Sequence, residues 1–163
     1  MPFLFGKQYS RAELMRRIGH LSQVGGVSLL EAADGPARGV RYLEFRSGAG
    51  FQFKVAIDRG MDVGWCDYHG QSLAWIPSTN LPAPWYFEQN AEFAWLRTVL
   101  GGLNNSCGLV HIGNPETADV SHYNFPARAT ERYGVHDRVG LLPGQLVHYG
   151  ERWDERFNAS CFV

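Results

Sequence analysis

The fold is decided by the stretch FQFKVAIDRGMD, which occupies residues 51–62. In residues 51–57 every second side chain is apolar, as expected where successive side chains of a strand point to opposite faces of a sheet. A charged glycine turn follows and leads into a second apolar run, residues 61–68. The stretch therefore predicts two consecutive strands, joined by a turn that carries Asp58, Arg59 and Asp62.

Two carboxylates and a guanidinium around one glycine are compatible with two structures. They can form an internal ion-pair clamp, or they can form the floor of a site for a polyhydroxylated ligand. Aromatic residues make up 13% of the chain, and glycine occurs 19 times. This pairing is typical of a many-stranded β protein with tight turns, and also of carbohydrate binding, so both alternatives stay open.

Composition limits the partners and the compartment. The 163 residues fit one domain or part of a larger one, and 45% of them are hydrophobic. A formal net charge of -1 gives no electrostatic basis for nucleic-acid binding, and the apolar stretches are too short to cross a membrane. The N-terminus lacks the features of a secretory signal, and three widely spaced cysteines are typical of reduced thiols. The sequence therefore predicts a cytoplasmic protein without a nucleic-acid or membrane partner.

Short strands separated by glycine turns recur along the chain. Ser10 and Glu13 have the spacing of a capping box, which predicts one short helix over residues 11–18. The pattern then predicts strands at 24–31, 39–46, 51–57, 61–68, 72–76, 145–153 and 158–163. Strands at this spacing predict a mainly β fold, a large antiparallel β-sandwich.

Two regions interrupt the strand pattern. Residues 77–90 form a proline-rich loop that includes Trp85, and residues 114–131 are polar and irregular. Residues 93–100 are compatible with either a helical turn or a strand. The chain stops inside the strand-like run 158–163, which favours a truncated chain or half of a larger sheet. An unpaired edge there makes a homo-dimer possible.

Three side chains are the first candidates for chemistry. His136 follows a glycine, and histidine exchanges protons near neutral pH; the alternative is a hydrogen-bonded core or turn residue. Arg97 lies shortly before two paired glycines and offers several donors to sugar hydroxyls or a carboxylate; the alternative is a salt bridge. His111 has apolar neighbours and is first interpreted as a buried, satisfied histidine. The histidine spacings match no metal motif, so neither a metal nor a cofactor is predicted.

The motifs at 58–62, 73–75, 101–103, 107–111 and 133–136 occur in an order that resembles the aldose 1-epimerase-like branch of the galactose mutarotase superfamily. The likeness runs from the N-terminal helix to Trp153. It implies an antiparallel β-supersandwich with a sugar site in a groove on its concave face, of which residues 1–163, a single domain, would be the N-terminal half. It also implies interconversion of sugar anomers by acid–base catalysis without a cofactor.

The resemblance assigns roles to individual residues. His136 matches the histidine of the family's Leu-His-Gly-Gly segment, which lies beside the ring oxygen, and is the predicted catalytic residue. Arg97 is the counterpart of an arginine that binds sugar hydroxyls, and His111 would lie near the site, either on the ligand or behind the groups that touch it. The substrate-binding groove would be shaped or braced by Asp58, Arg59 and Asp62.

Two departures from the family pattern bear on activity. Asp137 stands where the pattern has glycine, and it places a negative charge beside the histidine. The second catalytic histidine and the carboxylate base of the family come from the C-terminal half, so we expect little or no turnover from these 163 residues alone. The alternative function is a non-catalytic carbohydrate-binding or sugar-sensing protein that stacks sugars on Trp85, Tyr86 and Trp95. A metal-dependent sugar isomerase ranks third, on the presence of six histidines alone.

Overall fold

The computed structural model describes residues 3–4, 6–87, 92–123, 128–136, 138–153 and 159–162. In these ranges no helix is long and apolar enough to cross a membrane. The strands are β1 (Phe3–Leu4), β2 (Lys7–Gln8), β3 (Gly26–Glu31), β4 (Arg41–Arg46), β5 (Phe51–Ala56), β6 (Asp62–Tyr68), β7 (Gln71–Ser72), β8 (Glu116–Asp119), β9 (Thr130–Tyr133), β10 (Gly150–Trp153) and β11 (Ala159–Phe162). The helices are α1 (Arg11–Met15) and the short 3₁₀ helices η1 (Leu21–Gln23), η2 (Gly35–Ala37), η3 (Pro84–Tyr86), η4 (Ala94–Arg97) and η5 (Val139–Leu141).

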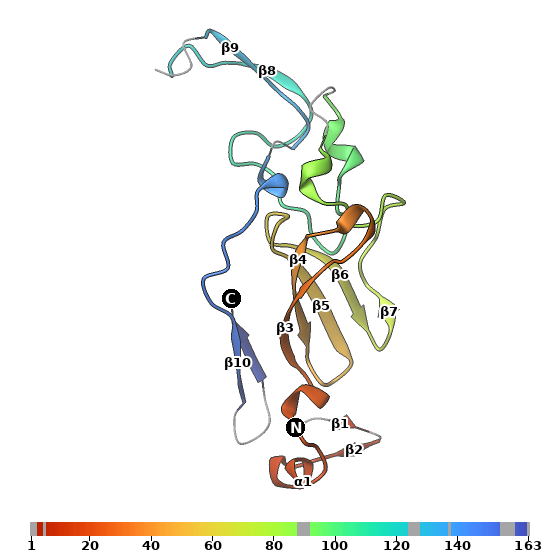
Figure 1. Ribbon diagram of the computed structural model, residues 1–163. Helices are drawn as coiled ribbons and strands as arrows, with labels where there is room; N and C mark the ends of the chain where they lie inside the picture. Colours follow the sequence, from red (N-terminus) through yellow and green to blue (C-terminus); the bar gives the residue numbers. More distant parts are fainter. Residues whose placement is uncertain are drawn as a thin grey trace.

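The centre of the molecule is an antiparallel five-stranded sheet with the order β3-β4-β5-β6-β7 (Figure 1). Its strands follow one another in the sequence. Short turns join β4 to β5, β5 to β6 and β6 to β7, while the longer connection from β3 to β4, residues 32–40, contains η2. The predicted run 51–57 becomes β5, and the run 61–68 becomes β6. The prediction of a mainly β, antiparallel, sandwich-like fold with one short N-terminal helix is confirmed.

The sheet is covered on both faces near the turn between β5 and β6. On one face Leu43, Phe45, Val55 and Ile57 form a core cluster, against which Leu146 packs from the segment before β10. On the other face a second cluster contains Val40, Tyr42, Ala56, Ala83 and Leu100. Burial on both faces fixes this end of the sheet most firmly, because burying apolar surface is the main source of stability.

A β-bulge at Gly64 shapes the region around this end of the sheet. Lys54 pairs with Trp65 and Val55 pairs with Val63, so Gly64 is an extra residue in β6. A Cβ atom at Gly64 would lie 2.8 Å from a methyl group of Leu100. The missing side chain therefore lets the segment that carries Leu100 lie directly on the sheet.

The same segment is joined to the strand side by a bridge between Trp75 and Gly102. Gly102 donates to the Trp75 carbonyl oxygen at 2.5 Å, and Leu103 donates to the Val63 carbonyl oxygen at 2.9 Å. The sequence predicted a strand over residues 72–76, and this prediction is wrong. The strand β7 ends at Ser72, and Trp75 makes the isolated bridge to Gly102. Residues 73–76 are all apolar, but among the described residues only Trp75 of this run makes a β-bridge.

Gly102 gives a prediction of its own. Its φ is +80°, and a Cβ atom there would clash with the Val63 carbonyl and lie 2.9 Å from Gly64 Cα. Gly102→Ala is therefore expected to lower the free energy of unfolding by about 3 kcal/mol, which urea denaturation measures. Gly70→Ala is the control, because its φ is +77° with nothing near the added methyl; about 1 kcal/mol is expected. Equal losses for the two variants would contradict the predicted clash.

The N-terminal helix is shorter than expected. The capping box of Ser10 and Glu13 is present, but α1 ends at Met15 rather than at residue 18. Both Arg17 and Ile18 donate to the carbonyl oxygen of Leu14, so the chain tightens into a turn after Met15. The buried side chain of Leu14 then packs with Val24 and Trp153.

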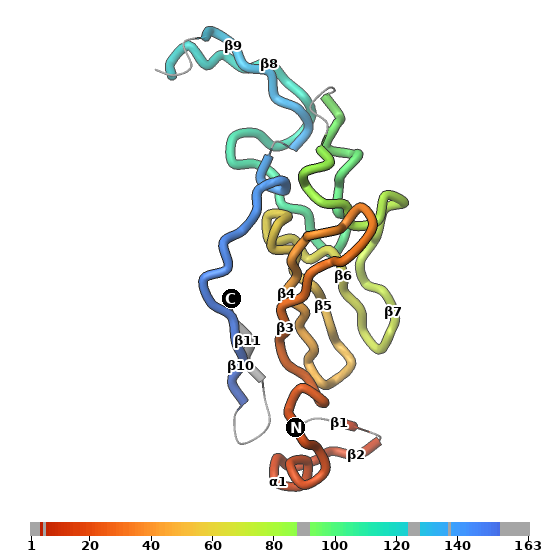
Figure 2. The backbone as a smooth tube through the Cα atoms, in the orientation of Figure 1, coloured from red at the N-terminus to blue at the C-terminus, as the bar shows by residue number. Residues whose placement is uncertain are grey.

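The hairpin β10–β11 lies against the edge strand β3. Figure 2 shows the chain running from η5 beside the sheet to β10. The strand expected at 145–153 is corrected to Gly150–Trp153. In the part that forms no strand, residues 145–149, Val147 is 88% exposed, while Leu146 packs against a core cluster. At the contact with β3, Glu151 Oε2 accepts the Val27 amide at 3.1 Å, and a side chain at Gly26 would clash with the same carboxylate.

A two-stranded ribbon, β8–β9, projects away from the main sheet (Figures 1 and 2). The sequence predicted an irregular structure for residues 114–131. This prediction is wrong for β8 and for the first two residues of β9, which form the ribbon. Its cross-strand pairs are Glu116 with Tyr133, Thr117 with Arg132, Ala118 with Glu131, and Asp119 with Thr130. Polar residues on both faces leave no apolar alternation to signal the strands.

Candidate functional site

The turn between β5 and β6 is held from one side by Arg41. Asp58 is 5% exposed. Its carboxylate accepts hydrogen bonds from the Arg41 guanidinium, at 2.5 Å between Nη2 and Oδ1, and from the Arg41 backbone amide, at 2.9 Å. Arg41 also donates to the Gly144 carbonyl oxygen at 2.9 Å. Burial alone would raise the pKa of Asp58, but the hydrogen bonds and charge of Arg41 outweigh it, so the pKa is lowered. The pair of Asp58 and Arg41 therefore joins β4, the turn and the segment after η5.

Arg59 and Asp62 hold the other side of the turn. Arg59 is 2% exposed and donates to the Thr98 carbonyl oxygen at the end of η4. Burial lowers the pKa of Arg59, and the charge of Asp62 opposes that shift. Asp62 is 1% exposed and accepts the Ser106 amide at 2.5 Å; burial raises its pKa, which Ser106 and Arg59 oppose. These contacts are those of the internal clamp, and they favour a bracing role over a ligand-contacting one.

The clamp fixes the segment that follows His136. Gly60 donates to the Leu142 carbonyl oxygen at 3.1 Å, and its φ is +62°. A Cβ atom at Gly60 would lie 2.7 Å from the Val139 carbonyl oxygen. Glycine is needed at this position because η5 lies directly on the turn, and this contact sets the position of η5.

His136 is held by backbone groups on several sides. Its amide donates to the Gly113 carbonyl oxygen at 3.2 Å, and its carbonyl accepts the Gly108 amide at 3.1 Å. The Gly113 amide lies 3.3 Å from Nδ1 and donates to it. Trp95, from η4, contacts the imidazole edge-on, with 4.7 Å between ring centroids. The backbone φ of +56° is left-handed, a conformation in which histidine is enriched relative to most residues.

These contacts select one neutral tautomer of His136. A nitrogen that accepts a hydrogen bond carries no proton, so in the neutral ring the proton is on Nε2. Within the described ranges Nε2 has no hydrogen-bond partner, and the side chain is only partly buried. The site therefore presents one N–H donor from a ring whose other nitrogen is already engaged.

His111 lies at the base of the β8–β9 ribbon. It is 9% exposed, with Nε2 at 2.7 Å from the Asn114 carbonyl oxygen and Nδ1 at 3.1 Å from Glu116 Oε1. Its ring stacks on Tyr133 at a centroid distance of 5.5 Å. The side chain is thus buried and hydrogen-bonded, as first interpreted from the sequence, and its predicted contact with ligand stays a prediction.

The other predicted site residues lie on the neighbouring 3₁₀ helices. Arg97 is the last residue of η4, two positions after Trp95, and its side chain is exposed. Trp85, in η3, is 54% exposed, and its ring packs over Gly39. Asp137 lies outside the described residues. The structure thus brings the 58–62 turn, η4 and His136 together, while Trp85 packs over Gly39, which precedes β4.

Sequence reasoning missed the groups that support these side chains. Arg41, Gly113 and Glu116 contact the predicted residues, yet none of the three stands in a motif singled out from the sequence. Tyr133 does belong to the 133–136 motif, but its stack on His111 was not predicted. A glycine between His111 and Asn114 gave no signal, because its function is to expose an amide. Only the fold shows which histidine that amide contacts.

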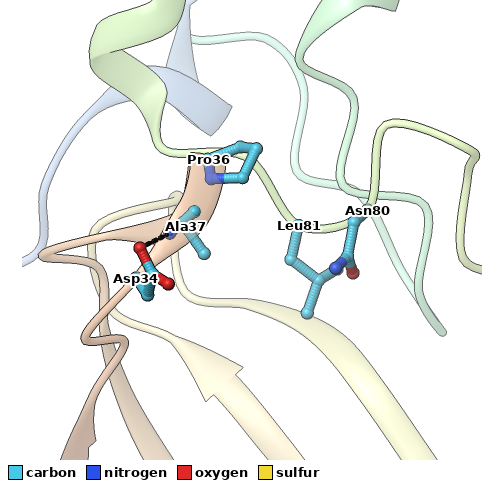
Figure 3. A pocket seen from close by; sticks show the side chains of 6 residues that line it. Asp34, Pro36, Ala37, Asn80 and Leu81 are labelled. Carbon is cyan, nitrogen blue, oxygen red and sulfur yellow. Dashed lines mark hydrogen bonds between the residues drawn. The ribbon is translucent and has the colours of Figure 1, made fainter.

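A shallow hollow lies elsewhere, between η2 and the loop before η3 (Figure 3). Asp34, Pro36, Ala37, Asn80 and Leu81 line it together with Gly35. Asp34 Oδ1 accepts the Gly35 amide at 2.7 Å, which satisfies that carboxylate locally. None of the predicted site residues lines the hollow, so we assign it no function.

Metal-binding and thiol chemistry find little support in the described part of the chain. Those residues contain no group of three or more histidine, cysteine, aspartate or glutamate side chains that could hold a metal ion. Cys66 and Cys107 form no disulfide there, and burial raises the pKa of the Cys66 thiol. Cys66 therefore belongs to the packed interior.

The fold and the clamped turn define a mainly β protein with a histidine-containing candidate site. Residues 37–160 match the family model described as Domain of unknown function (DUF4432), and the chain belongs to this family. The match includes the clamp, His111 and His136. Searches among curated proteins and among solved structures gave no match.

Proposed function

We propose that this chain is part of a carbohydrate-binding protein of the aldose 1-epimerase type, which interconverts sugar anomers by acid–base catalysis. The finer likeness to the galactose mutarotases, with a β-supersandwich and a sugar groove, belongs to this proposal. The observation that carries it is His136, with Nδ1 engaged by the Gly113 amide and Nε2 left as a donor beside Trp95. Such a group fits the hydrogen-bond donor or acid at a sugar ring oxygen.

In the proposed reaction the neutral His136 ring gives its Nε2 proton to the ring oxygen, which leaves an imidazolate hydrogen-bonded by the Gly113 amide, while a general base takes the proton from the anomeric hydroxyl. The C1–O5 bond then breaks, C1 becomes an aldehyde, and rotation about the C1–C2 bond exposes its other face. Ring closure returns each proton by the reverse of the same steps. We assign the general base to neither Asp58 nor Asp62, because both carboxylates are buried and engaged inside the clamp.

Arg97 and Trp95 would support the bound sugar. Both belong to η4, whose end is held by the hydrogen bond from Arg59 to the Thr98 carbonyl oxygen. An arginine offers five donors in a fixed plane, which suits neighbouring sugar hydroxyls. The clamp would thus act at a distance from the sugar, by holding the helix that carries these side chains.

Saturation-transfer NMR tests the proposal directly. The rate of anomer exchange is measured for a panel of neutral and acidic aldoses, with the 163-residue chain and with any longer native form. Exchange above background with at least one sugar, greatest in the longer form, is the expected result. Absence of exchange for every sugar in every form would overturn the enzymatic proposal.

A second candidate function is non-catalytic sugar binding. It is favoured by three exposed aromatic side chains on and near the 3₁₀ helices, Trp85, Tyr86 and Phe93. Aromatic faces offer stacking surface without any requirement for proton transfer. Broadened sugar signals without anomer exchange, in the same NMR experiment, would select this function.

A further inference from the structure

We propose that His111 is a positioning residue, which holds the Gly113 amide in place and thereby keeps the His136 ring in one tautomer. This inference rests on the proposed function, because it concerns the proton donor of that site. It gives His111 a role that does not require contact with a sugar. The residues that carry it are all close to the base of the β8–β9 ribbon.

The first step is the turn that contains Gly113. His111 Nε2 donates to the Asn114 carbonyl oxygen at 2.7 Å, so its side chain closes a loop over Ile112 and Gly113. The Gly113 φ is +115°, a conformation that side chains rarely adopt. Two features therefore set the conformation of this loop: the hydrogen bond from His111 and the positive φ of Gly113.

The second step joins this turn to the ribbon. His111 Nδ1 lies 3.1 Å from Glu116 Oε1, and its ring stacks on Tyr133 at an interplanar angle of 13°. Glu116 and Tyr133 are cross-strand partners, the first residue of β8 and the last of β9. One side chain therefore contacts both strands at the point where they leave for Gly113 and for His136.

The third step is the double contact between Gly113 and His136. The His136 amide donates to the Gly113 carbonyl oxygen, and the Gly113 amide donates back to the imidazole Nδ1. The second bond requires the amide to point at the ring. A loss of the His111 contacts would let the turn rotate, and the ring proton would then exchange between Nε2 and Nδ1. Groups that orient a functional histidine commonly act in this way, through its second ring nitrogen.

The test is the tautomer of His136, measured in the full chain with ¹⁵N-labelled histidine by long-range ¹H–¹⁵N correlation. The wild type is expected to give two well-separated ¹⁵N shifts for His136, which His136→Asn identifies by removing them. His111→Phe keeps the stack on Tyr133 but removes both ring nitrogens, and the two shifts are expected to converge. His122→Gln, an exposed histidine in the loop of the same ribbon, is the matched control and is expected to leave them unchanged.

Unchanged His136 shifts in folded His111→Phe would overturn the inference. If that variant fails to fold, Glu116→Ala decides, because the Glu116 side chain is 58% exposed and its removal is tolerated more readily. Partial convergence there supports the positioning role, and unchanged shifts overturn it. In a form that exchanges anomers, His111→Phe should also slow exchange by up to about 10²-fold. The His136 ¹⁵N shifts test the role of His111 without any turnover of sugar. The positioning role and the proposed enzymatic function can therefore be refuted independently of each other.

Discussion

His136→Asn is expected to lower the rate of anomer exchange by about 10²–10⁴-fold in the native form that shows exchange, the usual contribution of a general acid or base. Asparagine is chosen because it tolerates the left-handed φ of +56° at this position. Its amide can donate a hydrogen bond but transfers no proton at neutral pH. Sugar binding should therefore weaken only slightly while turnover is lost.

Saturation-transfer NMR provides both readouts for this variant, exchange rate and line broadening of the sugar. His122→Gln is the matched control, since it removes a histidine from the outer part of the ribbon. Its exchange rate should equal that of the wild type. Full activity in a folded His136→Asn protein would remove His136 from the catalytic role and leave the proposed fold untouched.

Asp58→Asn is expected to lower the free energy of unfolding by about 3 kcal/mol at pH 7, because it breaks a buried, hydrogen-bonded ion pair. The variant places an amide beside a guanidinium that makes three contacts with the carboxylate within 3.2 Å. Arg41 is partly exposed, so its charge can be rehydrated, which keeps the loss below that of a fully buried pair. Urea denaturation measures the change.

The loss should depend on pH with a definite sign. The pKa of Asp58 is lower in the folded protein than its usual value near 3.8, so the ion pair contributes fully above that value. The contribution declines as the pH falls through the lowered pKa. The difference between wild type and Asp58→Asn should therefore be constant between pH 6 and 7 and shrink below about pH 4.

Glu44→Gln makes the same kind of exchange on the neighbouring part of β4. Its ion pairs with Lys54 and Arg46 are longer, at 3.5 and 3.8 Å, and lie on the outer part of the sheet. A loss of less than about 1 kcal/mol is expected. An equal loss in Glu44→Gln and Asp58→Asn would show that the clamp is no stronger than an ordinary surface pair.

The sequence predicted the sheet where local and tertiary signals agree. Phe53 and Val55 alternate with polar residues, and the flanking turns contain glycine, so β5 is found within one residue of its expected end. The prediction of strands was wrong where a strand-like run has no neighbouring strand to pair with in the described part of the chain. Val147 lies in the run 145–149, which was expected to be part of a strand, yet among the described residues it belongs to no strand and its side chain is exposed.

The site was predicted only in part, for a related reason. The sequence singled out His136 and the charged turn, since residue type alone makes them candidates for chemistry. It left open whether Asp58 and Arg59 face a ligand or the interior, because that depends on Arg41 and Thr98, which are 17 and 39 residues away in the chain. Every residue except proline has a backbone amide, so the sequence does not indicate that the Gly113 amide binds His136. Only the folded structure shows this contact.

The contact between Glu151 and Val27 has a consequence for how the sheet ends. An edge strand can recruit a further strand, whether from its own chain or from another molecule, because it offers alternating donors and acceptors. A carboxylate accepts the Val27 amide but donates nothing, so the ladder cannot continue through it. Any strand that tried to extend the sheet at this edge would first have to displace a charged side chain and the hairpin that carries it. The five-stranded sheet is thus terminated at this point by a carboxylate that cannot continue the hydrogen-bond ladder and by the hairpin that carries it.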